Sequence, residues 1–318
     1  GVQTCALPIY SRMPLSSKRV LVTGGAGFVG SHLVDLLVGA GHDVTVLDDL
    51  SRGRREWIAE GATLHETDVR DAAAVLAATE AARPEIVVHL AALHFIPAVD
   101  DAPGLARAVN VDGTRHVLAA AGAVGARRVL FASTAAVYPN LEGPISERDP
   151  VAPIDLYGET KAEGEQMLAE LARSSHVSTV SARLFNVIGP RETNPHVLPE
   201  IVQQLRTGAT TLELGNLDPR RDYVDVRDVA VALMQLMAME SPGSVTFNVG
   251  TGRAVSVREL VDVCAGILGR SVSIRQTPER IRSVERMVLL SDARALSDAT
   301  GWRPSYTLSD TLRELLTG

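Results

Sequence analysis

The sequence predicts an α/β protein built on a doubly wound parallel sheet. Short apolar runs alternate with amphipathic stretches along most of the chain, and a glycine-rich turn follows the first apolar run. Strand, glycine turn and helix in that order are typical of the first unit of such a sheet. The 318 residues leave room for a large core and for a smaller C-terminal lobe beyond about Gly189.

The first strand and helix predict a dinucleotide site. Residues 19–23 have the apolar pattern of a strand, glycines recur through the turn from Gly24 to Gly30, and residues 31–40 have a helical apolar period. The N-terminus of such a helix offers N–H groups and a positive dipole end to a pyrophosphate, which glycines allow to approach closely. Asp48 ends the next strand, eighteen residues beyond Gly30, near the ~20 expected for an acid that binds ribose hydroxyls.

The later elements continue the alternation. Strands are expected near residues 62–66, 86–91, 128–132 and 177–185, and helices near residues 71–82, 104–124 and 157–173. Residues 192–208, 226–239 and 256–268 have the pattern of helices in the smaller lobe, whereas residues 245–249 alternate like a strand that returns to the main sheet. Residues 13–189 are therefore expected to form the dinucleotide-binding domain, and residues 190–318 mainly the substrate-binding lobe.

Residues 1–12 are expected to be a non-native leader. The segment from Gly1 to Ile9 resembles the translation of a sequencing-library adapter, so Met13 is the expected native start. Cys5 lies in this segment and is left out of any redox interpretation.

Composition favours a cytoplasmic enzyme and excludes other classes. A net charge of −7 argues against a nucleic-acid surface, which needs a basic footprint. Two cysteines cannot supply a disulfide framework. No apolar run approaches the ~18 residues of a transmembrane helix, so no membrane partner is expected.

Tyr157 and Lys161 form a candidate proton-transfer pair. They lie four residues apart in a predicted helix and therefore share one helical face. A Lys ammonium beside a phenol favours the phenolate, which lowers the phenol pKa from its usual value near ~10. Tyr157 is thus a candidate general base, and its pKa is expected to lie below the usual value of a phenol.

Taken in order, the motifs resemble the extended short-chain dehydrogenase/reductase family, in its branch of nucleotide-sugar epimerases and dehydratases. The resemblance covers residues 18–318 and includes Gly-x-x-Gly-x-x-Gly, Asp48, Tyr-x-x-x-Lys and the Arg220-Arg221-Asp222-Tyr223 segment. It implies a Rossmann-like domain, NAD as cofactor, a nucleotide-diphosphate sugar as substrate and a homodimer. It also implies that Thr134, Tyr157 and Lys161 are catalytic, with Thr134 hydrogen-bonding the same sugar oxygen as Tyr157 and Lys161 holding the nicotinamide ribose.

The resemblance also assigns binding residues. Those expected to bind the cofactor are Gly24, Gly27, Phe28, Val29, Gly30, Asp48, Asp49, Asp68, Val69, Leu90, Ala91, Ala92, Asn110, Tyr157, Lys161 and Leu184. Those expected to bind the substrate are His94, Ser133, Thr134, Asn186, His196, Val197, Arg221, Arg282 and Glu285. His196 stands where the family more often has asparagine.

NADP and a metal ion are the two other ligands that the sequence could indicate. Arg52, Arg54 and Arg55 follow the acidic pair and could favour the 2′-phosphate of NADP, but Asp48 would repel that phosphate, so NAD is favoured. The eight histidines are scattered and no Cys/His/Asp/Glu spacing matches a known ligand set, so no metal is expected.

The residues after Thr134 favour epimerisation. Dehydratases of the family have an Asp-Glu pair there for proton transfer and loss of water, whereas this chain has Ala135 and Ala136. The expected activity is therefore that of an isomerase in carbohydrate metabolism, similar to the UDP-glucose 4-epimerases, which acts at C4 through a transient 4-keto sugar. A 4-ketoreductase, another nucleotide-sugar dehydrogenase, a dehydratase and a non-catalytic nucleotide-binding module of the same fold remain alternatives.

Overall fold

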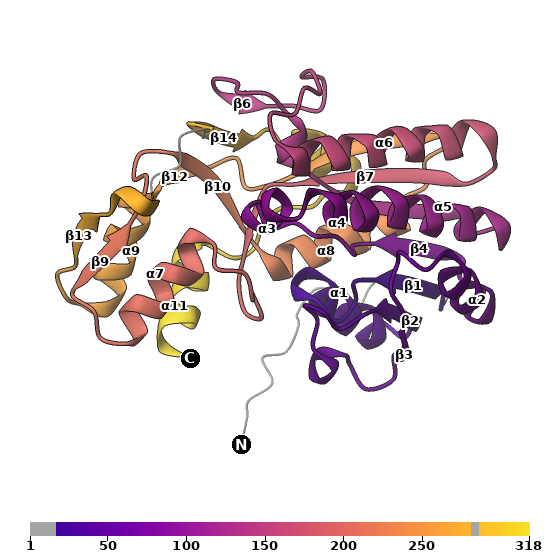
Figure 1. The fold of residues 1–318 in the computed structure, drawn as a ribbon, viewed down its shortest axis with the longest axis horizontal. Helices are drawn as coiled ribbons and strands as arrows, with labels where there is room; N and C mark the ends of the chain where they lie inside the picture. The colour runs from indigo at the N-terminus through magenta and orange to yellow at the C-terminus, as the bar shows by residue number, and fades with distance from the viewer. Residues whose placement is uncertain (1–16, 281–285) are drawn as a thin grey trace.

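A seven-stranded parallel sheet lies at the centre of the structure, with helices on both faces (Figure 1). The structure, a computed structural model, describes residues 17–280 and 286–318. The strands of the main sheet, in spatial order, are β11 (Ser244–Val249), β7 (Ser178–Leu184), β5 (Arg128–Thr134), β4 (Ile86–His89), β1 (Arg19–Thr23), β2 (Asp43–Asp48) and β3 (Thr63–Glu66). Every neighbouring pair in this sheet is parallel, as predicted for a doubly wound fold.

Both faces of the sheet are buried because alternate strand residues point to opposite sides. On one face, Val20 and Val22 pack with apolar residues of α1 (Phe28–Gly39) and α8 (Val226–Ala238). On the other face, Leu21 packs with residues of α2 (Ala72–Ala82), α5 (Gly113–Ala123) and α6 (Leu156–Ser174). The two layers hold the carboxyl ends of the strands, and hence the candidate site, in fixed positions.

One predicted helix is divided in the structure. The stretch 104–124 contains α4 (Pro103–Arg107), a π-helical turn at Ala108–Asp112, and then α5. A π turn inserts an extra residue into the helical repeat without changing the apolar pattern enough to be seen in the sequence. The turn places Asn110 in the interior, where it is 1% exposed.

A smaller lobe lies beside the main sheet (Figure 1). Its core is formed mainly by α7 (Val197–Arg206), α9 (Val257–Leu268), α11 (Leu308–Thr317) and the parallel pair of β9 (Thr211–Leu214) and β13 (Ser273–Gln276). A second sheet has the order β12 (Ala254–Ser256), β10 (Arg220–Asp225), β14 (Val288–Ser291) and β6 (Pro144–Ile145), with β8 (Asn186–Ile188) paired to β10. The helix α3 (Ile96–Asp101) precedes α4, and α10 (Arg294–Thr300) precedes α11.

The helix α8 does not belong to the smaller lobe, where its sequence pattern had placed it. It packs against α1 on the main sheet and leads into β11, which pairs in parallel with β7. The β10–α8–β11 connection therefore crosses from the second sheet to the main one. The loss of regular alternation after Gly189 hides this crossover in the sequence, because lobe segments are inserted between the strands.

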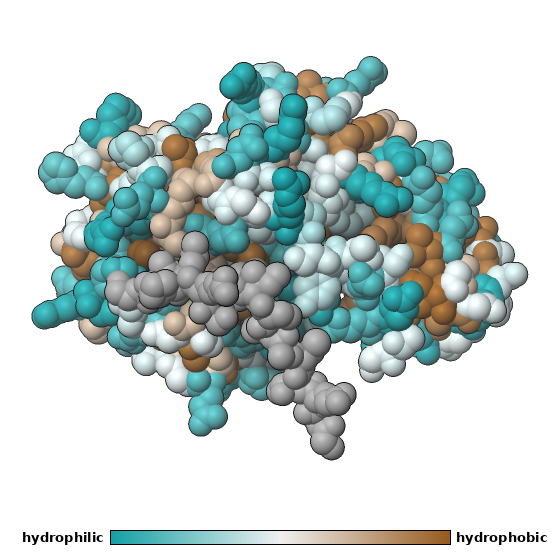
Figure 2. Space-filling view, turned by 180° about the vertical axis from the view of Figure 1, so that it is seen from behind, coloured by the Kyte–Doolittle hydropathy of each residue, from teal (hydrophilic) through white to brown (hydrophobic). Residues whose placement is uncertain are grey.

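Hydrophilic side chains cover much of the face seen in Figure 2, with apolar residues between them. In the part of the chain that the structure describes, no helix has both the length and the apolar character of a membrane span.

Candidate active site

A large cleft runs along the carboxyl ends of the main-sheet strands and continues into the smaller lobe. Its volume is about 1780 Å³, more than the ~300–1,000 Å³ of a typical small-ligand pocket. The cleft opens at the neighbouring strands β1 and β4, where the strand order reverses, which is where ligands bind in doubly wound sheets. The space suits a dinucleotide together with a second, extended ligand.

The glycine turn after β1 leaves no room for larger residues. Gly24 has a φ of +71°, and a Cβ there would lie 2.7 Å from the Ala91 backbone nitrogen. A Cβ on Gly30 would overlap the Gly24 carbonyl oxygen. The chain can therefore turn tightly into α1, whose N-terminus faces the cleft through Phe28 and Val29. These features fit the pyrophosphate of NAD.

Asp48, at the end of β2, lines this part of the cleft. One carboxylate oxygen accepts a hydrogen bond of 2.9 Å from the Ala26 amide, and the other accepts one of 2.9 Å from Leu50. Burial raises the pKa of Asp48, and these two hydrogen bonds oppose the rise. Because a carboxylate has about four acceptor positions, two remain for the hydroxyls of a ribose.

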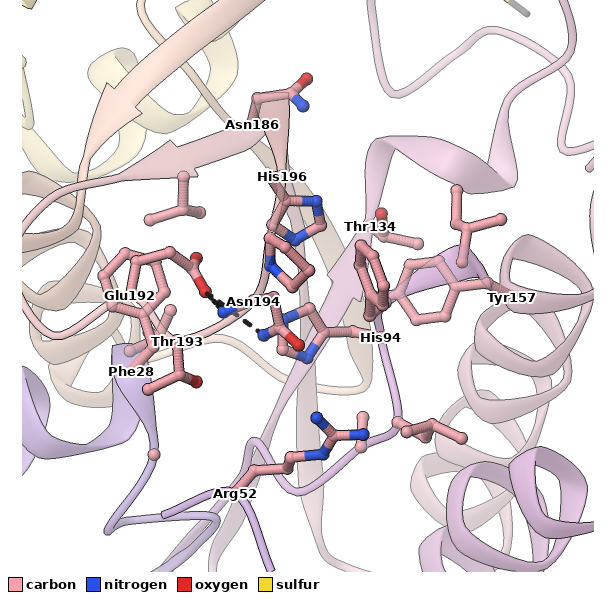
Figure 3. Close-up of a pocket in the computed structure, with 18 of the residues that line it drawn as sticks. Phe28, Arg52, His94, Thr134, Tyr157, Asn186, Glu192, Thr193, Asn194 and His196 are labelled. Atoms are coloured by element: carbon pink, nitrogen blue, oxygen red, sulfur yellow. Dashed lines mark hydrogen bonds between the residues drawn. The ribbon is translucent and has the colours of Figure 1, made fainter. Parts of the chain in front are cut away.

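The arginines that follow Asp49 have partners of their own. Arg55 forms an ion pair with Glu66, and Arg54 pairs with Glu56 and lies 5.1 Å from the Trp57 ring centre. Arg52 differs, because it lines the cleft (Figure 3). Of these three arginines, Arg52 is therefore the one placed to favour a 2′-phosphate.

We expect wild-type protein to bind NAD at least ~100-fold more tightly than NADP. Two charges ~4 Å apart at an effective dielectric constant of ~20 repel by up to ~4 kcal/mol, and Asp48 would face the extra phosphate. Asp48→Asn should narrow this difference, and Asp43→Asn, the same change at the other end of β2, should not. Calorimetric titration with both cofactors measures the effect. Equal wild-type affinities would show that Arg52 dominates instead.

The predicted catalytic residues converge where β5 ends and α6 begins. Asp155 caps α6 by accepting a 2.8 Å hydrogen bond from the Gly158 amide, and Tyr157 and Lys161 follow on one helical face. Thr134, the last residue of β5, lies beside Tyr157 (Figure 3), and its hydroxyl interacts with the phenol. Thr134 also accepts a 3.1 Å hydrogen bond from the Ala136 amide, which fixes the turn after the strand.

The expectation of a lowered Tyr157 pKa is wrong for this structure. Burial raises the Tyr157 pKa above its usual value, Asp155 adds to the rise, and the Thr134 hydroxyl opposes it. The Lys161 Nζ donates a 2.8 Å hydrogen bond to the Ala132 carbonyl and lies 4.6 Å from the Phe131 ring centre. Burial also lowers the pKa of Lys161 to about 7, against which Glu165 acts.

We expect Lys161→Met to make the cofactor-free protein more stable and inactive. The folded pKa of about 7 lies below the unfolded value of 10.5, so between these values the unfolded chain binds the extra proton. The free energy of unfolding of the wild type should therefore rise with pH across this window. Below pH 7, the destabilisation by the buried ammonium should have its full size. Methionine removes the buried charge, so thermal unfolding from pH 6 to 10 should show a higher melting temperature and no such rise. An unchanged slope would contradict the burial of the ammonium.

Two residues that are predicted to contact a ligand make hydrogen bonds within the protein. Asn110 does not line the cleft. Its side-chain amide accepts a hydrogen bond from the Leu93 backbone N–H and donates to the Leu93 carbonyl and to the Thr160 hydroxyl. Ser133 lines the cleft, but its hydroxyl donates a 2.5 Å hydrogen bond to Glu165. Asn110 is thus placed to position the loop after β4 against α6, and Ser133 to orient Glu165.

The remaining predicted residues fall into two groups. Arg282 and Glu285 lie outside the described residues. The others line the cleft, and these are Gly24, Gly27, Phe28, Val29, Gly30, Asp48, Asp49, Asp68, Val69, Leu90, Ala91, Ala92, His94, Thr134, Tyr157, Lys161, Leu184, Asn186, His196, Val197 and Arg221.

Asn186 is placed to contact a ligand. It follows β7 and lines the cleft, and within the described residues its buried Oδ1 has no hydrogen-bond partner. Buried polar atoms without a partner are uncommon and call for an explanation. A polar group of a substrate would supply the missing donor.

Four functional candidates were missed at the level of sequence. Arg286 donates to the Asp155 carboxylate at 2.7 Å and to the Ala136 carbonyl at 2.9 Å, so it joins the two turns that carry Tyr157 and Thr134. Glu165, Glu192 and Asn194 interact with predicted site residues through contacts made only by the fold. Only Glu165 had a sequence signal, since it lies four residues, or one helical turn, after Lys161.

Comparison with known proteins gives consistent matches over most of the chain. Residues 20–250 match the model of the NAD dependent epimerase/dehydratase family. A UDP-glucose 4-epimerase of Mycolicibacterium smegmatis is 36% identical over 303 residues, covering 92% of this chain and 95% of that protein. The Thermus thermophilus UDP-glucose 4-epimerase in complex with NAD superposes with a TM-score of 0.85 at 33% identity, covering 93% and 97% of the two chains. The Thermotoga maritima enzyme with UDP-glucose gives a TM-score of 0.88 at 29% identity, covering 93% and 97%.

Proposed function

This chain belongs to the NAD-dependent epimerase/dehydratase family, and we propose that its NAD-dependent epimerisation of a nucleotide sugar takes place at C4 of a UDP-hexose. The observation that carries the proposal is the convergence of Thr134, Tyr157 and Lys161 beside the turn Ala135–Val137, whose three side chains are apolar. One proton-transfer group suffices for removing and returning a hydride at a single carbon. UDP is proposed because the similar structure from Thermotoga maritima holds UDP-glucose.

The proposed roles follow from the positions of the side chains. Tyr157 takes the proton of the C4 hydroxyl, and Thr134 hydrogen-bonds the same oxygen. The glycine turn and Asp48 would hold NAD, which would supply the acceptor for the C4 hydride. After the keto sugar turns to present its other face, Tyr157 returns the proton as the hydride returns to C4, so atoms and electrons balance without loss of water.

Lys161 is proposed to support Tyr157 once the cofactor is bound. Burial lowers the pKa of Lys161 to about 7, so the charged and neutral forms are both populated near neutral pH. Hydrogen bonds to ribose hydroxyls would stabilise the charged form, since they favour the ammonium over the amine. Positive charge in the cleft then favours the phenolate and offsets the burial of Tyr157. The substrate diphosphate is proposed to contact Arg221 and Arg282, with Glu285 beside Arg282.

Product analysis tests the reaction. Purified protein given UDP-glucose or UDP-galactose, or their N-acetyl or uronic acid relatives, should interconvert C4 epimers at unchanged mass and without net gain of NADH. With deuterium at C4, the label should remain in the product. A product lighter by one water would instead identify a dehydratase, with His94 or Glu192 as the next groups to test for proton transfer. Accumulated NADH would identify a dehydrogenase.

A cytoplasmic homodimer is proposed as the working state. The cytoplasm supplies NAD and nucleotide sugars, and the buried Cys264 is a free thiol, which suits a reducing compartment. The homodimer rests on the family resemblance. Light scattering coupled to gel filtration should give twice the mass of one chain, and a monomer mass would contradict it.

A further inference from the structure

Three side chains of metal-ligating type meet at the mouth of the substrate side of the cleft. His94 comes from the loop after β4, whereas Glu192 and His196 come from the loop between β8 and α7 (Figure 3). Each offers one ligand atom, and these atoms all lie within 4.8 Å of one another. We call these three residues the His–Glu cluster. His94 lies about a hundred residues before the other two in the sequence, so sequence spacing alone does not reveal the complete set.

The spacing is within reach of a metal ion. Zn–N and Zn–O bonds of ~2.0–2.2 Å in a tetrahedral site place the ligand atoms about 3.4 Å apart. The cluster atoms therefore need to approach one another by at most about 1.4 Å, given the limit of 4.8 Å. All three side chains are half-buried and carried by loops, so rotations of the side chains can supply this movement.

Within the part of the chain that the structure describes, the Glu192 carboxylate accepts its hydrogen bonds from neutral donors. Its carboxylate accepts hydrogen bonds of 2.7 Å from the Asn194 backbone and 3.2 Å from the Asn194 amide. Among the described residues, no ion pair is recorded between this carboxylate and a Lys or Arg side chain. A half-buried carboxylate with neutral donors alone is a favourable place for a cation.

Asn194 links the cluster and offers a further oxygen. Its Nδ2 lies 3.0 Å from Nε2 of His94 as well as beside Glu192, and the residue is 5% exposed (Figure 3). Turning the amide about its last side-chain bond would exchange Nδ2 for Oδ1 and free the His94 nitrogen. The same side chain therefore bridges the cluster in the absence of an ion and can ligate one in its presence.

We propose that His94, Glu192 and His196 bind one divalent transition-metal ion of the zinc class, with an open position toward the cleft. Two imidazoles and one carboxylate suit Zn²⁺, and imidazole disfavours Mg²⁺ and Ca²⁺. The proposal goes beyond the epimerase reaction and does not depend on it, because metal binding is measured without substrate.

The test uses the purified full chain with the cofactor it carries, after removal of any affinity tag and treatment with a chelator. Calorimetric titration with Zn²⁺ should show one saturable site per chain. Co²⁺ in place of Zn²⁺ should give the intense visible absorption of a four- or five-coordinate ion, and addition of UDP-glucose should change that spectrum. No saturable Zn²⁺ binding, or a Co²⁺ spectrum like that of the hydrated ion, would overturn the proposal.

Matched variants locate the site. Glu192→Gln keeps the shape but removes the charge, and His196→Asn introduces the residue more common in the family. Each should weaken Zn²⁺ binding by more than the ~10- to 100-fold typical of losing an outer-shell partner. His176→Asn, at an exposed histidine between the end of α6 and the start of β7, should bind like wild type. Wild-type affinity in the first two variants would place the metal elsewhere; should either fail to fold by circular dichroism, the wild-type Co²⁺ spectrum decides.

Discussion

Replacing Tyr157 by phenylalanine should lower epimerase turnover by about 10²- to 10⁴-fold, the usual contribution of a positioned acid–base group, while NAD affinity stays unchanged. The variant loses only the phenol oxygen, and the ring that lines the cleft remains. Since the Thr134 hydroxyl interacts with that oxygen, the variant also leaves this hydroxyl without its partner. Stopped-flow absorbance of the nicotinamide should show no transient reduction on addition of a UDP-hexose.

A matched control separates chemistry from folding. Tyr306→Phe removes the same oxygen from a partly exposed ring that packs under Arg227, away from the cleft. It should keep wild-type turnover. Substantial hydride transfer in the Tyr157 variant would assign the proton transfer to another group, and His94 is the first to test because it lines the same cleft.

The main sheet could be predicted from sequence because its signals are local. The central strands β1, β2, β4 and β5 are short runs that are buried on both faces, and the crossover helices have an apolar period of their own. The strand ends at Asp48 and Thr134 and the start of α6 came with turn or cap residues beside them. The π turn at Asn110 and the crossover through α8 were missed because they depend on packing between distant segments, which leaves no periodic signal.

In the candidate site, too, local features could be predicted and contacts between distant segments could not. Residues in motifs, such as Gly30 and Tyr157, could be assigned because their spacing defines their geometry. The direction of the Lys161 side chain could not, because it depends on the Ala132 carbonyl across from α6. The His–Glu cluster is the extreme case, since two loops bring its members together.

A second large effect is expected at Glu165, behind the catalytic residues. Glu165 and Arg183 form a bidentate pair with distances of 2.8 and 2.6 Å, and their side chains are only 11% and 6% exposed. Arg183 also donates a 2.8 Å hydrogen bond to the Tyr138 hydroxyl. Glu165→Gln leaves this buried guanidinium without its counter-charge, and breaking such a pair costs about 3–5 kcal/mol of unfolding free energy.

Chemical denaturation measures this loss, and an exposed ion pair supplies the control. Glu213→Gln removes the same charge beside Arg275, where the side chains are 43% and 67% exposed, and should change stability by no more than ~1 kcal/mol. A similar small change at Glu165 would mean that water reaches Arg183 and that the pair is not buried in solution.

The same variant should also change the chemistry of the cleft. Glu165 raises the pKa of Lys161 against the effect of burial, so its neutralisation should lower that pKa below about 7 and leave less ammonium at neutral pH. If Lys161 must be charged to support the Tyr157 phenolate, the alkaline limb of the pH–rate profile should move to lower pH in Glu165→Gln. A loss of stability with an unmoved profile would show that Glu165 only holds Arg183 and has no influence on the proton-transfer pair.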